Sequence, residues 1–256
     1  MSAIALGPVG LAWAGLLVVG VLGFALATGV NLIKDGLVAS ARTTAQLLGV
    51  GLILNPVFAR ESWLLIVLVL GVMTLIAGWT GGRRVERALR GTGPALTLIL
   101  LAVSSLTLAY VTQLVVGVDG PQPRYLIPLG GIVLGNAMTA GSLAAQRFHD
   151  DVREQRGRVE AALGLGATPA QATQAALARA LRAALTPTIN AMLIVGIVKL
   201  PGIMTGQMLG GADPFGAATY QIVILFMLLF SDGVTALLIL RWLRRRAFNA
   251  AWQLRI

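Results

Sequence analysis

Long apolar runs, separated by short polar turns, are the feature that most limits how this chain can fold. A helix needs about 20 residues, at a rise of 1.5 Å each, to cross the hydrocarbon of a bilayer. Runs of about this length lie at Val9–Val30, Leu37–Leu54, Trp63–Trp79, Pro94–Val116, Leu126–Ala145, Thr188–Gly210 and Ala218–Leu240. The sequence therefore predicts an all-α, multi-pass protein of the cell (inner) membrane, embedded in the lipid bilayer by about seven transmembrane helices.

Composition points to the same class. Of the 256 residues, 57% are hydrophobic and 12% are charged, and the mean hydropathy is +0.83. A soluble domain of this length would expose too much apolar surface. No repeat or linker divides the chain, so residues 1–256 are expected to form a single transmembrane domain. The absence of cysteine excludes disulfides and thiolate metal sites. The first basic residue is Lys34, so no cleavable signal is expected.

The distribution of basic residues predicts the orientation. The formal net charge is +10, which in a membrane protein reflects basic cytoplasmic loops rather than a nucleic-acid partner. If the C-terminus is cytoplasmic, sixteen of the twenty Lys and Arg residues lie inside and only Arg60 and Arg124 lie outside. The inside set is Lys34, Arg83, Arg84, Arg87, Arg90, Arg147, Arg153, Arg156, Arg158, Arg179, Arg182, Arg241, Arg244, Arg245, Arg246 and Arg255. We therefore expect the N-terminus outside and the C-terminus inside.

Residues 147–187 form the one long polar interval and are predicted to be a cytoplasmic helical elbow between the fifth and sixth spans. A first helix from about Arg147 to Leu163 should stop at Gly164 and Gly166, because glycine tolerates the left-handed backbone of a helix end. A second helix should start with Thr168 as N-cap and Pro169 at its first position. Thr186-Pro187 is expected to interrupt that second helix.

The elbow carries Glu160-Ala161-Ala162, then Gly164 or Gly166, and later Pro187. This pattern resembles the EAA loop of ABC-transporter permeases, although an ordinary amphipathic connector in an Ala-rich chain would share it. The surrounding segments make the resemblance specific, and they occur in the order Ile127–Gly131, Gly135–Met138, Leu163–Pro169, Arg182–Thr188, Leu200–Gly206 and Tyr220–Val223. Together they resemble the FetB-like family of bacterial iron-export ABC permeases, whose relatives include plant aluminium-tolerance proteins. The likeness covers about Arg42 to Leu240 and is strongest from Ile127 onward.

This resemblance implies a permease subunit that exports a metal ion, with iron as the cargo, and that forms a homodimer on a cytosolic ABC ATPase subunit. ATP and Mg would be bound by that partner and no cofactor by this chain. The sequence itself contains no GxxxxGK[ST] run, the loop that cradles the phosphates of ATP. The chain is therefore expected to depend on another subunit for ATP hydrolysis and not to be an enzyme itself. The residues implied to couple to the ATPase are Glu160, Ala161, Ala162, Leu163, Gly164, Gly166, Ala167, Thr168 and Pro169.

Three charged residues lie within the predicted spans: Arg42, Lys199 and Asp232. A charge there is costly, by about 2.5–3.5 kcal/mol on insertion scales, so each should face a partner or water. Arg42 and Asp232 both lie roughly 10 Å from the cytoplasmic ends of their helices, so they are able to pair, within a chain or across a dimer. Snorkelling of Arg42 to the interface is the alternative. Gln46 follows Arg42 by four residues, on the same helix face.

The sixth span is predicted to be kinked or unwound around Pro201 and Gly202. Irregular backbone at membrane depth persists only where protein or a water-filled cavity covers it, so a substrate path is expected there, with a simple packing kink as the alternative. Asn136 is predicted to line this path, because its amide is expected to be buried and must then find hydrogen bonds. The methionines nearby could bind a soft metal, but methionine in an apolar helix is more often a core filler. The predicted path comprises Arg42, Gln46, Asn136, Met138, Asn190, Lys199, Pro201, Gly202, Met204 and Asp232.

The intramembrane charges depart from the family pattern. An acidic residue is typical of the family at Asn190, a basic one at Leu193, and small polar ones at Lys199 and Asp232. The metal ligands are therefore not assigned, and the lone His149 is interpreted as an interfacial residue.

Other functions stay open from the sequence. One is an ABC permease for another cargo, such as a lipid-like or sugar-nucleotide substrate. A second is a secondary transporter or channel that works without an ATPase and uses the three intramembrane charges as a relay. A membrane enzyme is a distant alternative, because no nucleophile–base or metal constellation is visible.

Overall fold

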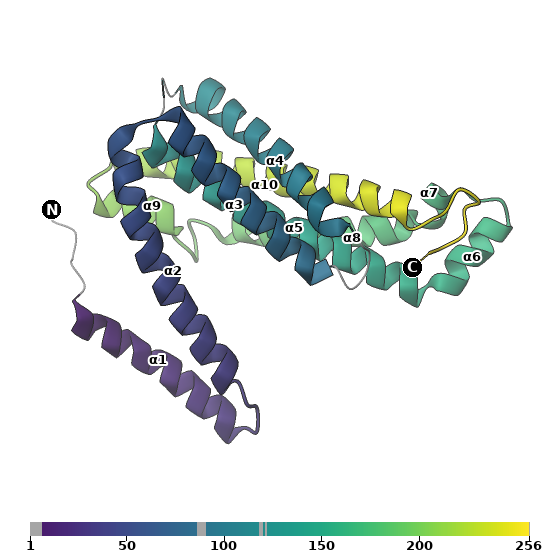
Figure 1. The fold of residues 1–256 in the computed structure, drawn as a ribbon, viewed down its shortest axis with the longest axis horizontal. Coiled ribbons are helices and arrows are strands. Elements are labelled where there is room, and N and C mark those ends of the chain that lie inside the picture. The colour runs from purple at the N-terminus through teal and green to yellow at the C-terminus, as the bar shows by residue number, and fades with distance from the viewer. Residues whose placement is uncertain (1–6, 86–90, 118–119, 121, 256) are drawn as a thin grey trace. The chain divides into compact units, whose positions relative to one another are not determined.

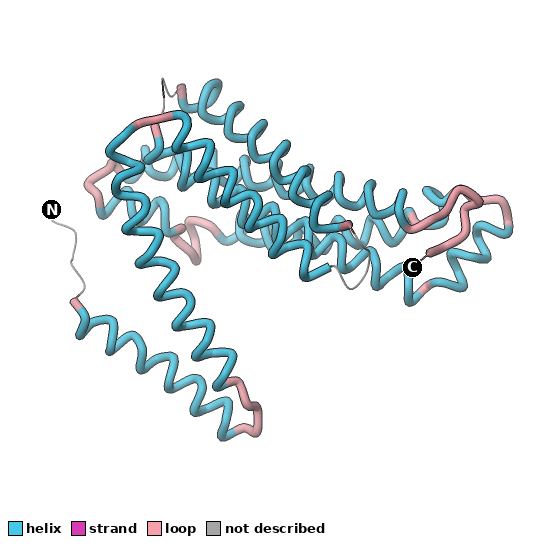
Figure 2. Tube along the Cα trace, in the orientation of Figure 1, coloured by secondary structure: helices cyan, strands magenta, loops and turns pink. Residues whose placement is uncertain are grey.

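The computed structural model describes residues 7–85, 91–117, 120 and 122–255. Throughout these residues the chain is helical apart from turns and two isolated β-bridges, as Figure 2 shows. Six of the described helices are long and apolar enough to cross a membrane: Val9–Ala27, Ile33–Arg60, Trp63–Arg83, Thr92–Val116, Pro123–Glu154 and Pro214–Arg246. The chain is thus an all-α, multi-pass membrane protein, as predicted. Arg87 and Arg90, which the orientation argument uses, lie outside the described residues.

The helices group into two compact units, and the first comprises Met1–Glu61 with Leu209–Gly211. It contains α1 (Pro8–Ala27) and α2 (Ile33–Arg60), which contact each other where Gly36 of α2 meets the buried Leu22 of α1. The second apolar run was predicted to end at Leu54, but helix α2 continues through Pro56 to Arg60. The prediction that residues 1–256 form one domain stays a prediction.

The second unit comprises Ser62–Met208 and Ala212–Ile256. Its long helices are α3 (Trp63–Val85), α4 (Thr92–Tyr110), α5 (Pro123–Glu154), α8 (Gln174–Ile194) and α10 (Pro214–Arg246), and the π-helix η1 (Val111–Val116) continues α4. Helix α5 contacts α3, α4, α8 and α10 and is therefore the centre of this bundle (Figure 1). The short helices are α6 (Arg156–Gly164), α7 (Pro169–Ala172) and α9 (Gly202–Leu209).

The core of the second unit is apolar and includes close backbone approaches. Phe148, Leu96, Leu100 and Leu240 are almost fully buried in it. Helices α3 and α4 approach so closely at Gly82 that a side chain there would overlap the backbone of Gly93. Small residues allow this kind of packing in membranes, where apolar burial does not drive helices together.

The sixth predicted span, Thr188–Gly210, is not one continuous helix, and the expected number of spans stays a prediction. Helix α8 ends at Ile194, residues 195–201 are not helical, and α9 begins at Gly202. The break expected near Pro201 is confirmed, and it starts six residues earlier than Pro201.

The expected interruption at Thr186-Pro187 is wrong, because α8 continues through Pro187. Proline removes one N–H from the helix ladder. The Thr186 hydroxyl donates to the carbonyl of Arg182 at 2.7 Å, one turn earlier. The carbonyl that loses its donor is that of Ala183, so this bond does not replace the missing one. The packing of α8 against α5 and α10 therefore holds the helix together.

The predicted helix from Arg147 to Leu163 is also divided. Its first half is the end of α5, which runs for 32 residues to Glu154, and its second half is the separate helix α6. The chain turns at Gln155, whose backbone leaves the helical region.

Candidate coupling elbow and translocation path

The elbow consists of α6, the turn after it, and α7. Helix α6 ends at Gly164 as predicted, and Gly166 has the left-handed φ of 90° that completes the turn. Leu165, at the tip of this turn, is 90% exposed. Of the predicted coupling residues, Glu160, Ala161, Gly164 and Gly166 are exposed, and Ala162, Leu163, Ala167, Thr168 and Pro169 are half-buried. The elbow thus presents a short, exposed helical edge.

Thr168 fixes the return of the chain into α7. Its hydroxyl accepts from the backbone N–H of Gln171 at 3.3 Å, and the side chain of Gln171 accepts from the backbone N–H of Thr168 at 2.9 Å. This capping box satisfies two helix-end donors. The predicted roles of Thr168 as N-cap and Pro169 as first helical residue are confirmed.

A buried carboxylate joins the base of the elbow to the bundle. Asp151, near the end of α5, is 2% exposed. Its Oδ1 lies 3.3 Å from Nε of Arg147, and its Oδ2 accepts from Nε of Arg179 on α8 at 2.8 Å. Since one carboxylate binds arginines from two helices, a tilt of α8 would be transmitted to α5 at this point.

The C-terminal segment packs against the elbow, which sequence reasoning missed. Val159 of α6 is buried in a small cluster with Ala247 and Phe248, and Leu254 packs against the same cluster. Phe248 and Leu254 form an isolated antiparallel bridge. The one available signal was two apolar residues, Phe248 and Leu254, in an arginine-rich tail. In Figure 1, α6, α7 and the C-terminus lie together at one end of the bundle.

A groove runs between α6 and this C-terminal segment. Its volume is about 630 Å³. Helix α6 contributes Arg156 and Glu160, which pair at 2.8 Å, and the segment contributes Trp252. The groove is lined by Arg156, Glu160, Leu163, Gly164, Ala251, Trp252, Gln253 and Leu254.

Asp232 is the one predicted path residue that is fully buried, with 1% of its surface exposed. Its Oδ2 accepts from the hydroxyl of Thr188 on α8 at 2.6 Å. Its Oδ1 has no hydrogen-bond partner, and neither does the hydroxyl of Thr235, one turn further along α10. The carboxylate therefore links α8 to α10 and retains an unused acceptor inside the bundle.

The break between α8 and α9 contains Lys199 and ends at Pro201. Gly196 has a φ of 80°, and its N–H donates to the carbonyl of Lys199 at 3.0 Å, which closes a tight loop. Lys199 is exposed, and so are the apolar side chains of Ile197 and Val198 at the tip of the loop. Pro201 and Met204 are half-buried, and Gly202 is exposed.

Asn136 is exposed, so the prediction that its amide is buried is wrong. Its amide donates to the carbonyl of Ile132, one turn earlier in α5, at 2.9 Å. Asn190 is exposed on α8, and Met138 is half-buried near Gly81 of α3. Neither asparagine is therefore buried within the bundle of the second unit.

Arg42 and Gln46 lie on α2 in the first unit, and both are exposed. Asp232 belongs to the second unit. The pairing of Arg42 with Asp232 therefore stays a prediction. Among the described residues, no group of three His, Cys, Asp or Glu side chains is close enough to hold a metal ion.

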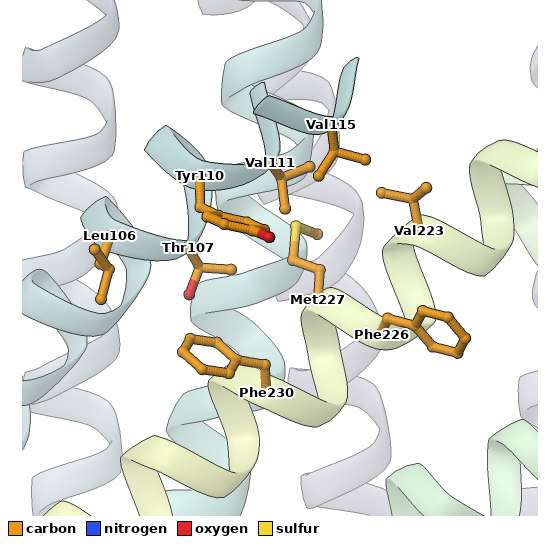
Figure 3. Close-up of a pocket in the computed structure, with 9 residues that line it drawn as sticks. All are labelled: Leu106, Thr107, Tyr110, Val111, Val115, Val223, Phe226, Met227 and Phe230. Carbon is orange, nitrogen blue, oxygen red and sulfur yellow. The ribbon is translucent and has the colours of Figure 1, made fainter. Parts of the chain in front are cut away.

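An apolar cavity of about 530 Å³ lies between α4, η1 and α10 (Figure 3). Its side chains include Tyr110, Phe226 and Phe230, all largely exposed, and none of the nine labelled residues carries a charge. The hydroxyl of Thr107 is already bonded to Val103. Such a lining suits hydrocarbon and offers a cation almost no ligands, so this cavity is not a candidate ion path.

Comparisons with known proteins agree on one family. The model of an uncharacterised protein family, UPF0014, matches residues 8–248. A UPF0014 membrane protein of Synechocystis sp. is 38% identical over 92% of this chain and 93% of its own length. The Arabidopsis thaliana protein ALUMINUM SENSITIVE 3 is 37% identical, over 88% of this chain and 82% of its own length. The probable iron export permease protein FetB of Escherichia coli is 31% identical, over 86% and 84% respectively. No solved structure matches.

Proposed function

Because the chain belongs to the uncharacterised protein family UPF0014, we propose that it is the membrane permease subunit of an ABC transporter that exports a metal ion. The chain is a multi-pass membrane protein, and one of its relatives is named a probable iron export permease. Iron is accordingly the first cargo to test. ATP and Mg would be bound and used by a separate cytosolic subunit, and this chain would serve as the transporter.

The elbow is the observation that carries this proposal. A short exposed helix, α6, lies at the end of a helix that is too long for the membrane: the 32 residues of α5 extend to about 48 Å, against about 30 Å of hydrocarbon. Asp151 ties α5, the helix that leads into the elbow, to α8, and Val159 ties α6 to the C-terminal segment. Movement of a subunit docked on α6 would therefore reach α5 and α8 directly.

A second copy of the chain belongs to the proposal. The loop between α8 and α9 exposes Ile197 and Val198 next to backbone that leaves the helix. Irregular backbone inside a membrane is tolerated only where protein or water covers it. A partner copy that packs over this loop would provide the cover and would enclose a path between the two chains.

A secondary transporter is the second candidate, because Asp232 keeps an unpaired oxygen inside the bundle. Such a protein would move its cargo without an ATPase. An ABC permease with a non-metal cargo is the remaining alternative, since the described residues contain no carboxylate cluster.

The test is reconstitution in vesicles. The chain would be purified with the ABC ATPase subunit whose gene lies nearest to its own, and ATP-dependent movement of Fe²⁺ and of other metal ions would be measured. ATP-dependent metal movement supports the proposal. Movement at the same rate without the ATPase would favour the secondary transporter and would overturn the proposal.

Docking can be tested separately at Leu165, the exposed tip of the elbow. Leu165→Asp is expected to abolish co-purification of the ATPase, because a charge would replace an apolar contact. The matched control is Ala178→Asp, a similarly exposed change on α8, which should leave co-purification intact. Equal co-purification of both variants would contradict docking at the elbow.

A further inference from the structure

We infer that the C-terminal segment, residues 247–255, is a second docking element for the cytosolic ATPase subunit, with Trp252 as its aromatic anchor. This inference rests on the proposed function and extends it, because the elbow pattern alone assigns docking to residues 160–169.

The conformation of Trp252 is the first observation. Its φ is +60°, in the left-handed region that a bulky residue rarely adopts. Hydrogen bonds hold it there: the N–H of Trp252 donates to the carbonyl of Asn249 at 3.0 Å, and the side chains of Asn249 and Gln253 bond at 2.7 Å. Yet Trp252 as a whole is 50% exposed, so burial in a core does not account for the strain. Strained backbone of this kind gathers at functional positions such as ligand clamps and switch regions.

The second observation is that Trp252 borders the groove shared with α6. The groove is concave and combines the Arg156–Glu160 pair with the apolar side chains of Leu163 and Leu254. An aromatic anchor beside arginine is the composition found where binding energy concentrates in protein interfaces. Because one wall of the groove is the coupling helix itself, a subunit that docks on α6 would also meet Trp252.

Charge and position indicate a protein with an acidic surface as the occupant. Residues 153–160 and 241–255 together contain eight arginines and two glutamates. Anionic lipid would also attract these arginines. However, α5 and α10 extend for about 48 and 50 Å, against about 30 Å of hydrocarbon. Because the groove is formed by the segments that follow these two helices, the occupant that we name is a cytosolic protein, and lipid is one outcome of the test.

The chain contains no cysteine, so single-cysteine variants can test this directly. The labelled positions would be Leu165→Cys, Ala251→Cys, which lies in the groove beside Trp252 and leaves the indole in place, and the 81% exposed Phe215→Cys at the start of α10. Each variant would be labelled with maleimide in detergent, with and without the ATPase subunit encoded nearest to this chain. We expect the ATPase to slow labelling at positions 165 and 251 at least ten-fold and to leave position 215 unchanged.

The possible results separate the two proposals. Protection at position 165 without protection at position 251 would overturn this inference and leave the proposed function standing. Protection at neither position would overturn both. Protection of position 251 in anionic-lipid vesicles without the ATPase, to the same extent as with it, would assign the segment to the membrane and overturn the inference.

A second variant tests the indole of Trp252 without destabilising the C-terminal segment. Trp252→Gly deletes the indole and relieves the left-handed backbone, so the segment should fold at least as well as before. We expect this variant to bind the ATPase at least ten-fold more weakly, whereas Trp252→Phe should retain most of the affinity. Unchanged binding by Trp252→Gly would contradict the role of Trp252 as an anchor.

Discussion

At the scale of single residues, Asp151 shows how a polar group becomes part of a membrane bundle. It is buried near the C-terminal end of α5, where Nε of Arg179 donates to its Oδ2 and Nε of Arg147 lies 3.3 Å from its Oδ1. A buried carboxylate without such partners would be strongly destabilising. The arginines are themselves 52% and 41% exposed, so solvent screens part of the interaction.

Asp151→Ala is expected to lower the free energy of unfolding by about 2 kcal/mol, since hydrogen bonds to charged groups contribute about 1.5–3 kcal/mol. Unfolding of the purified protein in detergent, followed by tryptophan fluorescence, measures this. The control is Asp150→Ala, the neighbouring exposed carboxylate, which should change stability by less than about 0.5 kcal/mol. Equal effects of the two changes would show that the triad does not hold α5 to α8.

Individual turn residues were predictable from the sequence because their chemistry is local. Gly166, Thr168 and Pro169 took the expected roles, since left-handed backbone, an N-cap and a first helical position each depend on a residue's own preferences. The predictions of a helix break at Pro187 and of a buried amide at Asn136 were wrong, because both properties depend on tertiary packing. Packing keeps α8 continuous through Pro187, and the face of α5 that carries Asn136 is left uncovered in the single chain.

At the scale of elements, the length of an apolar run predicted a single long helix correctly for six of the seven runs. For the remaining run, Thr188–Gly210, the prediction of a single helix from length was wrong. That run is apolar enough to span, but Gly196 and Pro201 divide it into α8 and α9. The C-terminal segment was missed for a different reason. Its contact with Val159 joins residues almost ninety positions apart, and no periodic pattern reports such a contact.

The break between α8 and α9 gives a prediction at this scale. Gly196→Ala should strain the loop by about 1 kcal/mol, because φ there is +80°. We expect ATP-dependent metal movement to fall several-fold while co-purification of the ATPase is unchanged.

The matched control for Gly196 is Gly206→Ala in α9. That glycine has open space around its Cβ position and no positive φ, so alanine should be neutral or slightly stabilising there. If both changes slow transport alike, the shape of the loop is not what matters. If Gly196→Ala transports at the original rate, the break has no part in the path.

For the molecule as a whole, the orientation predicted from charge can be measured. Sixteen of twenty basic residues lie on the side assigned to the cytoplasm, which includes the elbow. In cells, a membrane-impermeant maleimide should label Phe215→Cys and not Leu165→Cys. In inside-out vesicles the result should reverse. Labelling of Leu165→Cys in intact cells would place the elbow outside and end the ATPase proposal.

The last prediction concerns the two intramembrane charges that belong to different units. Asp232 is buried with one oxygen unbonded, and Arg42 is a cation predicted to lie at similar depth. If they pair, removing either one leaves the other without a counter-charge in the membrane. Asp232→Asn and Arg42→Gln should then each reduce transport strongly, and the double variant should be no worse than either one. A coupling of at least about 1 kcal/mol in the mutant cycle is expected.

Arg60→Gln, at the opposite end of α2, provides the control, and its effect should add to that of Asp232→Asn. If the effects of Arg42→Gln and Asp232→Asn also simply add, the two residues do not pair. Arg42 would then snorkel to the interface, and the unbonded oxygen of Asp232 would have a different partner.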